Sequence, residues 1–212
     1  TIRRLVAISE SDEVFQHSLP EKVPELQRHA IEALAVLGED AALVKAVVRH
    51  SADVEPLRRL RSNLSPISDA DIAPAIEAIA RSDPMVRKRG YFAIAVSGRS
   101  DLLPLIRKGL SQAAPTDEDS LGALWALFGL VGKDDASVEL FAAHLAYRNH
   151  RHVAMAGLLQ TERSDARSIL VAELARLDAN VPYGPDGALP IELANYPDTR
   201  AAALKYIREV QL

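Results

Sequence analysis

Small and apolar residues recur along this chain at intervals of three and four, which is the spacing of one face of an α-helix. The clearest stripe begins after Asp83 and Pro84 and ends before Gly98. Asp is a favoured N-cap, Pro is tolerated at the first helical position, and Gly readily takes the left-handed conformation that ends a helix. The pattern therefore predicts a helix whose buried stripe is Val86, Gly90, Ala93 and Ile94.

A second helix is predicted after Gly98, with Ser100 and Asp101 as its caps and with Leu103, Ile106 and Leu110 inward. The same two-helix pattern occurs 60 residues earlier without gaps. Because 60 residues make two units of about 30, we expect a divergent unit between them. The matched positions of the earlier unit are Pro24, Leu26, Ala30, Ala33, Leu34, Gly38 and Leu43.

The intervening segment is predicted to form two helices, over about residues 54–64 and 71–81. Ser68 and Asp71 have the spacing of a capping box at the start of the second of these helices. The residues expected in the core are Leu57 and Leu60 of the first helix and Ile72, Ile76 and Ile79 of the second.

A shift of 34 residues aligns a further unit, residues 117–145, with the clearest one. Leu124 occupies the position of the small Gly90, which implies either a wider helix spacing or a displaced register. Asp134 or Asp135 is expected to begin the second helix of this unit. A weaker match follows over residues 147–177.

Residues 179–197 contain four Pro and two Gly, so a long loop is predicted there. Two interpretations stay open. The loop is either a binding segment, with Tyr183 and Tyr196 as candidate contacts, or only the connection to a capping helix over residues 198–212.

The run Asp-Pro-x-Val-Arg, followed by spaced small residues, Gly and a Leu-Pro second helix, resembles HEAT repeats of the short kind seen in PBS-lyase-type HEAT proteins. The resemblance is clearest in residues 83–111 and covers about half of the chain. It implies an all-α fold, an α-solenoid of about five to six antiparallel helix pairs in one domain. The approximate repeats are 1–20, 22–50, 53–81, 83–111, 117–145 and 147–177.

In such repeats the second helices line the concave side, and an acid and a base at the positions of Asp83 and Arg87 link successive repeats. The resemblance therefore implies a concave face of mixed charge. Such a face favours a protein or peptide partner over a phosphate backbone, which would need clustered cations. The candidate contacts are Lys45, Arg49, Glu77, Arg81, Arg107, Glu139, His144, Arg167 and Glu173.

Composition adds exclusions to this picture. The absence of cysteine excludes disulfides, thiolate metal sites and a cysteine nucleophile. A net charge of −4 gives no global attraction for nucleic acid or an anionic membrane. No apolar run approaches the ~20 residues of a membrane span, and the first ten residues carry charges unlike a signal peptide. We therefore expect a soluble, cytoplasmic protein.

Candidate chemistry is sparse. The chain has no glycine-rich phosphate loop, nucleophile elbow or zinc-protease helix motif, so no catalytic, cofactor or metal site is predicted. His150 and His152 would lie about 200° apart on a helix, and with His144 they are expected at a solvated helix junction. Trp125 is interpreted as a core residue or an interface anchor. Two basic clusters have no interleaved aromatic residues and are expected on a solvated convex face: Arg58, Arg59 and Arg61, and Arg87, Lys88 and Arg89.

These patterns favour a non-catalytic scaffold that binds a protein or peptide on its concave face. Two alternatives remain. Short HEAT-like repeats also occur in lyases that attach tetrapyrroles, so a bilin lyase or chaperone-like activity is one of them. Some alkylated-base glycosylases use HEAT-like repeats, so nucleic-acid binding or base repair is the other, which the acidic net charge disfavours.

Overall fold

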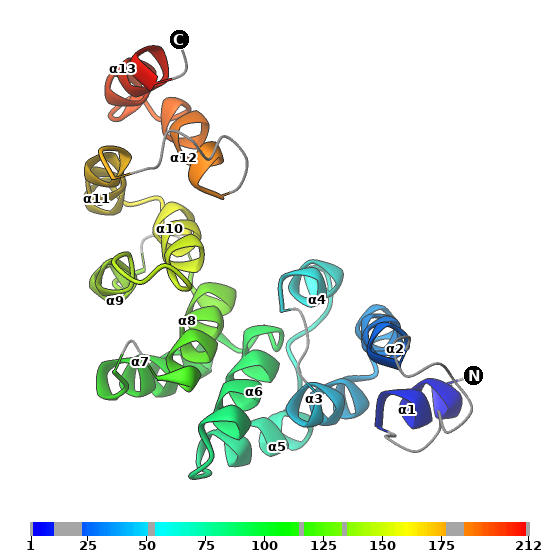
Figure 1. Ribbon diagram of the computed structural model, residues 1–212. Coiled ribbons are helices and arrows are strands. Elements are labelled where there is room, and N and C mark those ends of the chain that lie inside the picture. The colour runs from blue at the N-terminus through cyan, green and yellow to red at the C-terminus, as the bar shows by residue number, and fades with distance from the viewer. Residues whose placement is uncertain are drawn as a thin grey trace. The chain divides into compact units, whose positions relative to one another are not determined.

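The computed structural model describes residues 2–10, 23–50, 54–114, 117–132, 135–176 and 185–210. Within these ranges every regular element is a helix and no β-strand occurs, so the predicted all-α class is confirmed (Figure 1). The α-helices are α1 (Ile2–Glu10), α2 (Val23–Leu37), α3 (Asp40–Arg49), α4 (Val54–Arg61), α5 (Asp69–Ile79), α6 (Pro84–Ala95), α7 (Leu103–Gln112), α8 (Glu118–Leu130), α9 (Val138–Ala143), α10 (Arg151–Gln160), α11 (Ser164–Leu174), α12 (Pro185–Ala194) and α13 (Arg200–Val210).

The chain divides into two compact units, Thr1–Leu130 and Val131–Leu212. In the first unit, which holds α1 to α8, several helices contact the next helix in the chain or the helix after that, and α3 also contacts α6. Thus α2 packs on α3 and α4, and α6 packs on α4, α5 and α8. The second unit holds α9 to α13, in which α11 contacts α10 and α9 on one side and α12 and α13 on the other. None of the described helices is both long and apolar enough to span a membrane.

The predicted start and stop signals of α6 are confirmed. The Asp83 carboxylate accepts a hydrogen bond from the Met85 backbone N–H at 2.8 Å, and Pro84 is the first helical residue. Gly98 has φ of +69°, as does Gly38 after α2, so both glycines provide left-handed stops. Ser68 caps α5 by accepting from the Asp71 N–H. Local chemistry therefore sets these helix ends as the sequence indicates.

The second helix of this unit begins differently from the prediction. Residues Ser100–Leu102 form a 3-10 turn, and α7 begins at Leu103 with no side-chain cap. The Asp101 carboxylate instead pairs with Arg99 at 2.7 Å. Ser100 and Asp101 are therefore not the caps of α7.

Helices α6 and α8 are packed backbone to backbone. A Cβ at Gly122 would lie 2.9 Å from Lys88 Cα, and one at Gly129 would overlap the Ala95 carbonyl oxygen. These two glycines are two turns apart on one face of α8. Leu124 is fully buried. Gly90 approaches Ala75 and Ile79 of α5, so the glycines of α8 serve a different helix contact from that of Gly90.

The predicted loop at 179–197 is wrong over residues 185–194, which form α12 with Pro190 inside it. An interior proline costs a helix about 3 kcal/mol. Leu189 and Leu193 are buried in the contacts of α12 with α10, α11 and α13, and each buried leucine contributes about 1.5–3 kcal/mol. Tertiary packing therefore offsets the local signal. Residues 177–184, with Tyr183, lie outside the described part of the chain.

Candidate functional site

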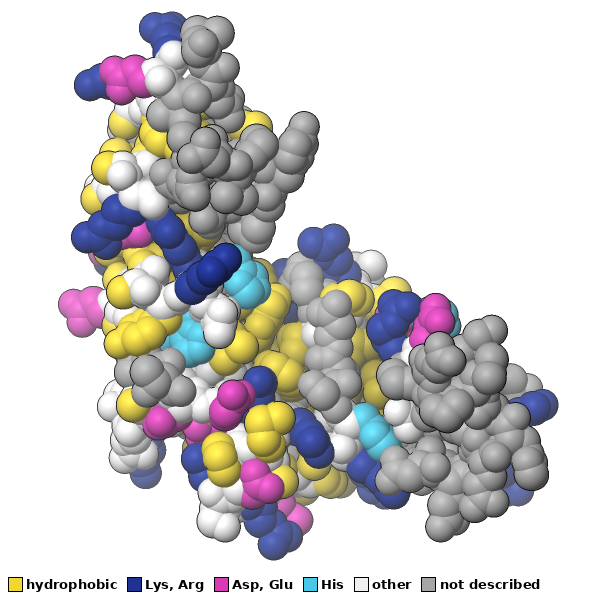
Figure 2. Space-filling view, viewed as in Figure 1, with side chains coloured by type: hydrophobic (Ala, Val, Ile, Leu, Met, Phe, Trp, Pro, Cys, Tyr) yellow, Lys and Arg dark blue, Asp and Glu magenta, His cyan; other side chains and the backbone are white. Residues whose placement is uncertain are grey.

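The predicted concave-face residues fall on or beside α3, α5, α7, α9 and α11, and most of them are accessible. Over α5 and α6 the face seen in Figure 2 carries acidic and basic side chains beside apolar ones. The candidates that are exposed or half-buried are Lys45, Arg49, Glu77, Arg81, Arg107, Glu139 and Arg167.

Two of the candidates are buried, which corrects their assignment to an exposed face. His144 is 3% exposed and Glu173 is 5% exposed. The Glu173 carboxylate pairs with Arg151 at 3.3 Å and with Arg176 at 2.8 Å. A buried carboxylate requires such compensation. Glu173 is therefore engaged inside the second unit and is not accessible to a partner.

His144 forms a buried polar pair with His150, and the solvated junction predicted for them is wrong. Their Nδ1 atoms lie 2.9 Å apart, and the Tyr147 ring lies near both imidazoles. Burial, followed by the charge of His150, lowers the pKa of His144 to about 4. At neutral pH His144 is therefore neutral. The described residues contain no group of three or more His, Cys, Asp or Glu side chains that could hold a metal ion.

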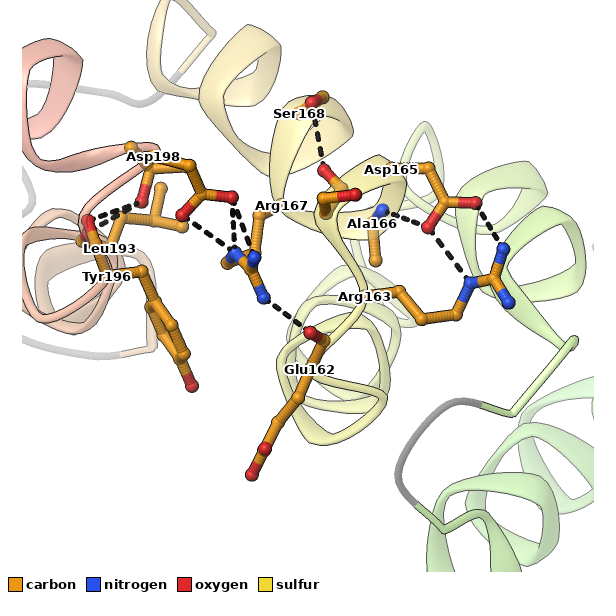
Figure 3. A network of polar contacts seen from close by, with 11 residues as sticks. Glu162, Arg163, Asp165, Ala166, Arg167, Ser168, Leu193, Tyr196 and Asp198 are labelled. Carbon is orange, nitrogen blue, oxygen red and sulfur yellow. Dashed lines mark hydrogen bonds and ion pairs between the residues drawn. The ribbon is translucent and has the colours of Figure 1, made fainter.

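Arg167 and Tyr196 are engaged with each other inside the second unit. The Arg167 guanidinium donates to the Asp198 carboxylate at 2.7 Å and to the Glu162 carbonyl (Figure 3). It also lies 4.8 Å above the Tyr196 ring. The hydrogen bond from Arg167 lowers the pKa of Asp198. These contacts connect α11 to the turn between α12 and α13, so both candidates have structural roles.

Arg87 makes the same arrangement in the first unit. It donates to the Ser82 carbonyl, five residues back, and to the Asp119 carboxylate, 32 residues ahead. Arg167 reaches five residues back and 31 residues ahead. Arg87 therefore forms an ion pair between two helices, α6 and α8, as the sequence predicts for the base of such a link. Asp83 does not take part as the acid, because it caps α6.

The basic clusters are less solvated than predicted. Arg61 is buried and bonds to Asp40 and to the Val96 and Ser65 carbonyls. Arg58 lies 4.5 Å above the Phe128 ring, which is edge-to-face with the half-buried Trp125. The fold thus brings an aromatic ring to one of these arginines, although none lies near it in the sequence.

An open groove of about 290 Å³ lies between α5 and α7 in the first unit. Ile76 of α5 is 36% exposed and Leu105 of α7 is 37% exposed, so both large aliphatic side chains are in contact with solvent. The sequence assigns Ile76 to the core, and this assignment is wrong because α5 and α7 do not close over it. The groove is lined by Ile76, Ile79, Ala80, Tyr91, Leu105, Lys108, Gly109 and Gln112.

Tyr91 extends from α6 into the groove and is only 7% exposed. Its hydroxyl lies so close to Gly109 that a Cβ there would overlap it. Burial, and then the Asp119 carboxylate, raises the pKa of Tyr91 above its usual value, so the hydroxyl is protonated at neutral pH. It makes no hydrogen bond to any residue of the described ranges. The hydroxyl is therefore a donor held beside an apolar groove.

Lys108 is the charged residue among the described residues that line the groove. It follows Leu105 by three residues and precedes Gln112 by four, so these three share one face of α7. Lys108 has no ion pair within the described chain. The groove therefore combines aliphatic walls with an ammonium group, an amide and a phenol.

Sequence reasoning did not single out Leu105, Lys108 or Gln112, and it placed the binding contacts on the neighbouring Glu77 and Arg107. One signal was present. Leu103, Leu105 and Ile106 make more apolar surface than a single stripe needs, which indicates a second apolar face on α7.

No protein-family model matches this chain, and neither a curated protein nor a solved structure matches it.

Proposed function

We propose that this chain is a non-catalytic interaction scaffold, one HEAT-like α-solenoid domain whose second helices bind a protein or peptide. The groove between α5 and α7 is the proposed docking site. It lies on the second helices, which is the side that the HEAT resemblance implies for binding.

The helix contacts support the solenoid part of the proposal. In a stack of helix pairs each helix contacts its own partner and the equivalent helix of the next pair, as α2 does with α3 and α4. Arg87 and Arg167 each bond to a carboxylate 32 or 31 residues ahead, which is close to the expected repeat length of about 30. Small-angle scattering tests this part: an elongated particle is expected, and a compact globule would contradict it.

The groove carries the binding part of the proposal. Ile76 and Leu105 leave aliphatic surface in water on facing helices, and burying such surface contributes about 25 cal/mol per Å². Concave apolar surface with a few polar groups is the common character of binding sites. A partner that covers this groove would gain that free energy.

Leu105→Glu tests the docking site. The side chain is 37% exposed, so the charge should leave the fold intact but oppose an apolar contact. Met85→Glu is the matched control, because Met85 is 39% exposed on α6 and does not line the groove. Both variants and the wild type are used as affinity baits in extract of the source cells, with crosslinking, and recovered proteins are then purified and titrated.

We expect to purify a protein that binds the wild type and Met85→Glu directly. The same protein should bind Leu105→Glu at least about 30-fold more weakly, as for a central interface residue. Its crosslinks should map to α5 and α7. Recovery of no protein with this dependence would reject the groove as the docking site.

A further inference from the structure

The walls of the α5–α7 groove are two helix faces that no helix of the described residues covers. Ile76, Ile79 and Ala80 form one wall, and Leu105 and Gly109 lie on the other. The volume of about 290 Å³ is at the lower end of the roughly 300–1,000 Å³ that enclose a complete small molecule. The groove therefore suits one or two side chains of a partner segment rather than a whole ligand.

Each of the three polar side chains that line the groove, Tyr91, Lys108 and Gln112, carries a hydrogen-bond donor. Lys108 presents an ammonium group, which has no acceptor, and the Tyr91 hydroxyl is held beside Gly109 without a hydrogen bond to a described residue. Asp119, whose charge acts on Tyr91, is already paired with Arg87 at 2.6 Å. A ligand that brings an acceptor with negative charge would satisfy both donors.

We infer that the partner segment is an acidic amphipathic peptide, an inference that rests on the proposed docking function. Its aliphatic side chain packs against Ile76 and Leu105, and a carboxylate within one helical turn bonds to Lys108 and Tyr91. Charge complementarity selects this occupant. A phosphate backbone is disfavoured, because one ammonium group between aliphatic walls provides no row of cations for counterion release.

The position of Gly109 makes this arrangement possible. Any side chain there would collide with the Tyr91 hydroxyl and displace it from the groove. The hydroxyl is thus reachable from the groove because α7 has no Cβ at this point.

The test uses the whole chain and a displayed library of random dodecapeptides. Peptides are selected on the wild type and counter-selected on Leu105→Glu. The best binders are synthesised, and each acidic residue is replaced by its amide. Binding of acid and amide peptides is then titrated on the wild type, on Lys108→Gln, on Tyr91→Phe and on the control Lys205→Gln, which changes an exposed lysine of α13.

We expect selected peptides that carry an aliphatic and an acidic residue within four positions. Replacing the acid should weaken binding to the wild type and to Lys205→Gln at least fivefold, and to Lys108→Gln less than twofold. Tyr91→Phe should weaken the acid peptide but not its amide. If peptides depend on Leu105 yet bind equally as acid and amide, this inference is wrong and the docking proposal stands. If no selected peptide depends on Leu105, the docking site itself is wrong.

Discussion

Helices α6 and α8 meet without a gap, whereas α5, which packs on α6, and α7, which packs on α8, leave a groove, although all four belong to the same unit. The close contact has glycines where the helices touch, at 122 and 129. The groove has large aliphatic side chains at its walls and a tyrosine between them. Side-chain size at the contact sets how closely helices approach, so α6 and α8 are in close contact whereas α5 and α7 are separated.

Gly129→Val should have the largest effect, because it breaks the close contact. Its Cβ would overlap the Ala95 carbonyl oxygen, and overpacking against a backbone atom costs about 3 kcal/mol. Urea unfolding followed by fluorescence of Trp125, which lies in α8, measures the loss. The control is Gly132→Ala, whose Cβ meets no atom within 4 Å. Equal stability of the two variants would contradict this account of the contact.

Arg87→Met should have the next largest effect. It leaves the Asp119 carboxylate, whose side chain is 9% exposed, without its cation, at a cost of about 2 kcal/mol. Arg167→Met leaves the more exposed Asp198 and should cost about 1 kcal/mol or less. Urea unfolding of both variants compares them. A larger loss for Arg167→Met would show that burial of the acid does not decide the effect.

Acid should weaken the contact between α9 and α10, where His144 and His150 are paired. The unfolded chain protonates His144 near pH 6.5, but the folded protein does so only near pH 4. Unfolding therefore takes up a proton between these values, so stability is complete above pH 6.5 and decreases as pH falls towards 4. We expect a loss of about 1.5 kcal/mol between pH 6.5 and 5. Thermal unfolding at both pH values measures it, and in His144→Gln the difference should shrink.

Tyr91→Phe should have the smallest effect, because it changes the groove without closing it. The hydroxyl makes no hydrogen bond to a described residue, so its removal should alter the free energy of unfolding by less than about 0.5 kcal/mol. Urea unfolding is again the measurement. A loss above about 1 kcal/mol would show that the hydroxyl is satisfied inside the protein and is not a donor for a ligand.

Local signals in the sequence were reliable where backbone chemistry decides the outcome. The cap at Asp83, the stop at Gly98 and the capping of α5 by Ser68 are all present. Such features depend on a few neighbouring residues, so a single sequence contains them. The helical class and most helix positions follow from them.

The errors arise where distant residues decide. Ile76 has the periodicity of a core residue, but it is exposed because α7 does not approach α5. Residues 185–194 have loop composition, but burial of Leu189 and Leu193 makes them helical. His144 and Glu173 look like surface residues, but partners from other elements allow their burial. The groove was missed for the same reason, since it depends on the spacing of two helices that are not adjacent in the chain.

The arrangement shared by Arg87 and Arg167 also restricts how a chain of this kind can change in length. Each arginine bonds to a carbonyl at the turn before its own helix and to a carboxylate 31 or 32 residues further on. Deleting a single helix would leave the guanidinium without its acid, whereas duplicating or removing a whole helix pair would supply an equivalent acid at the same distance. Gain or loss of whole helix pairs therefore preserves these ion pairs. Recombination at the turns between helix pairs would let such a protein lengthen without losing them.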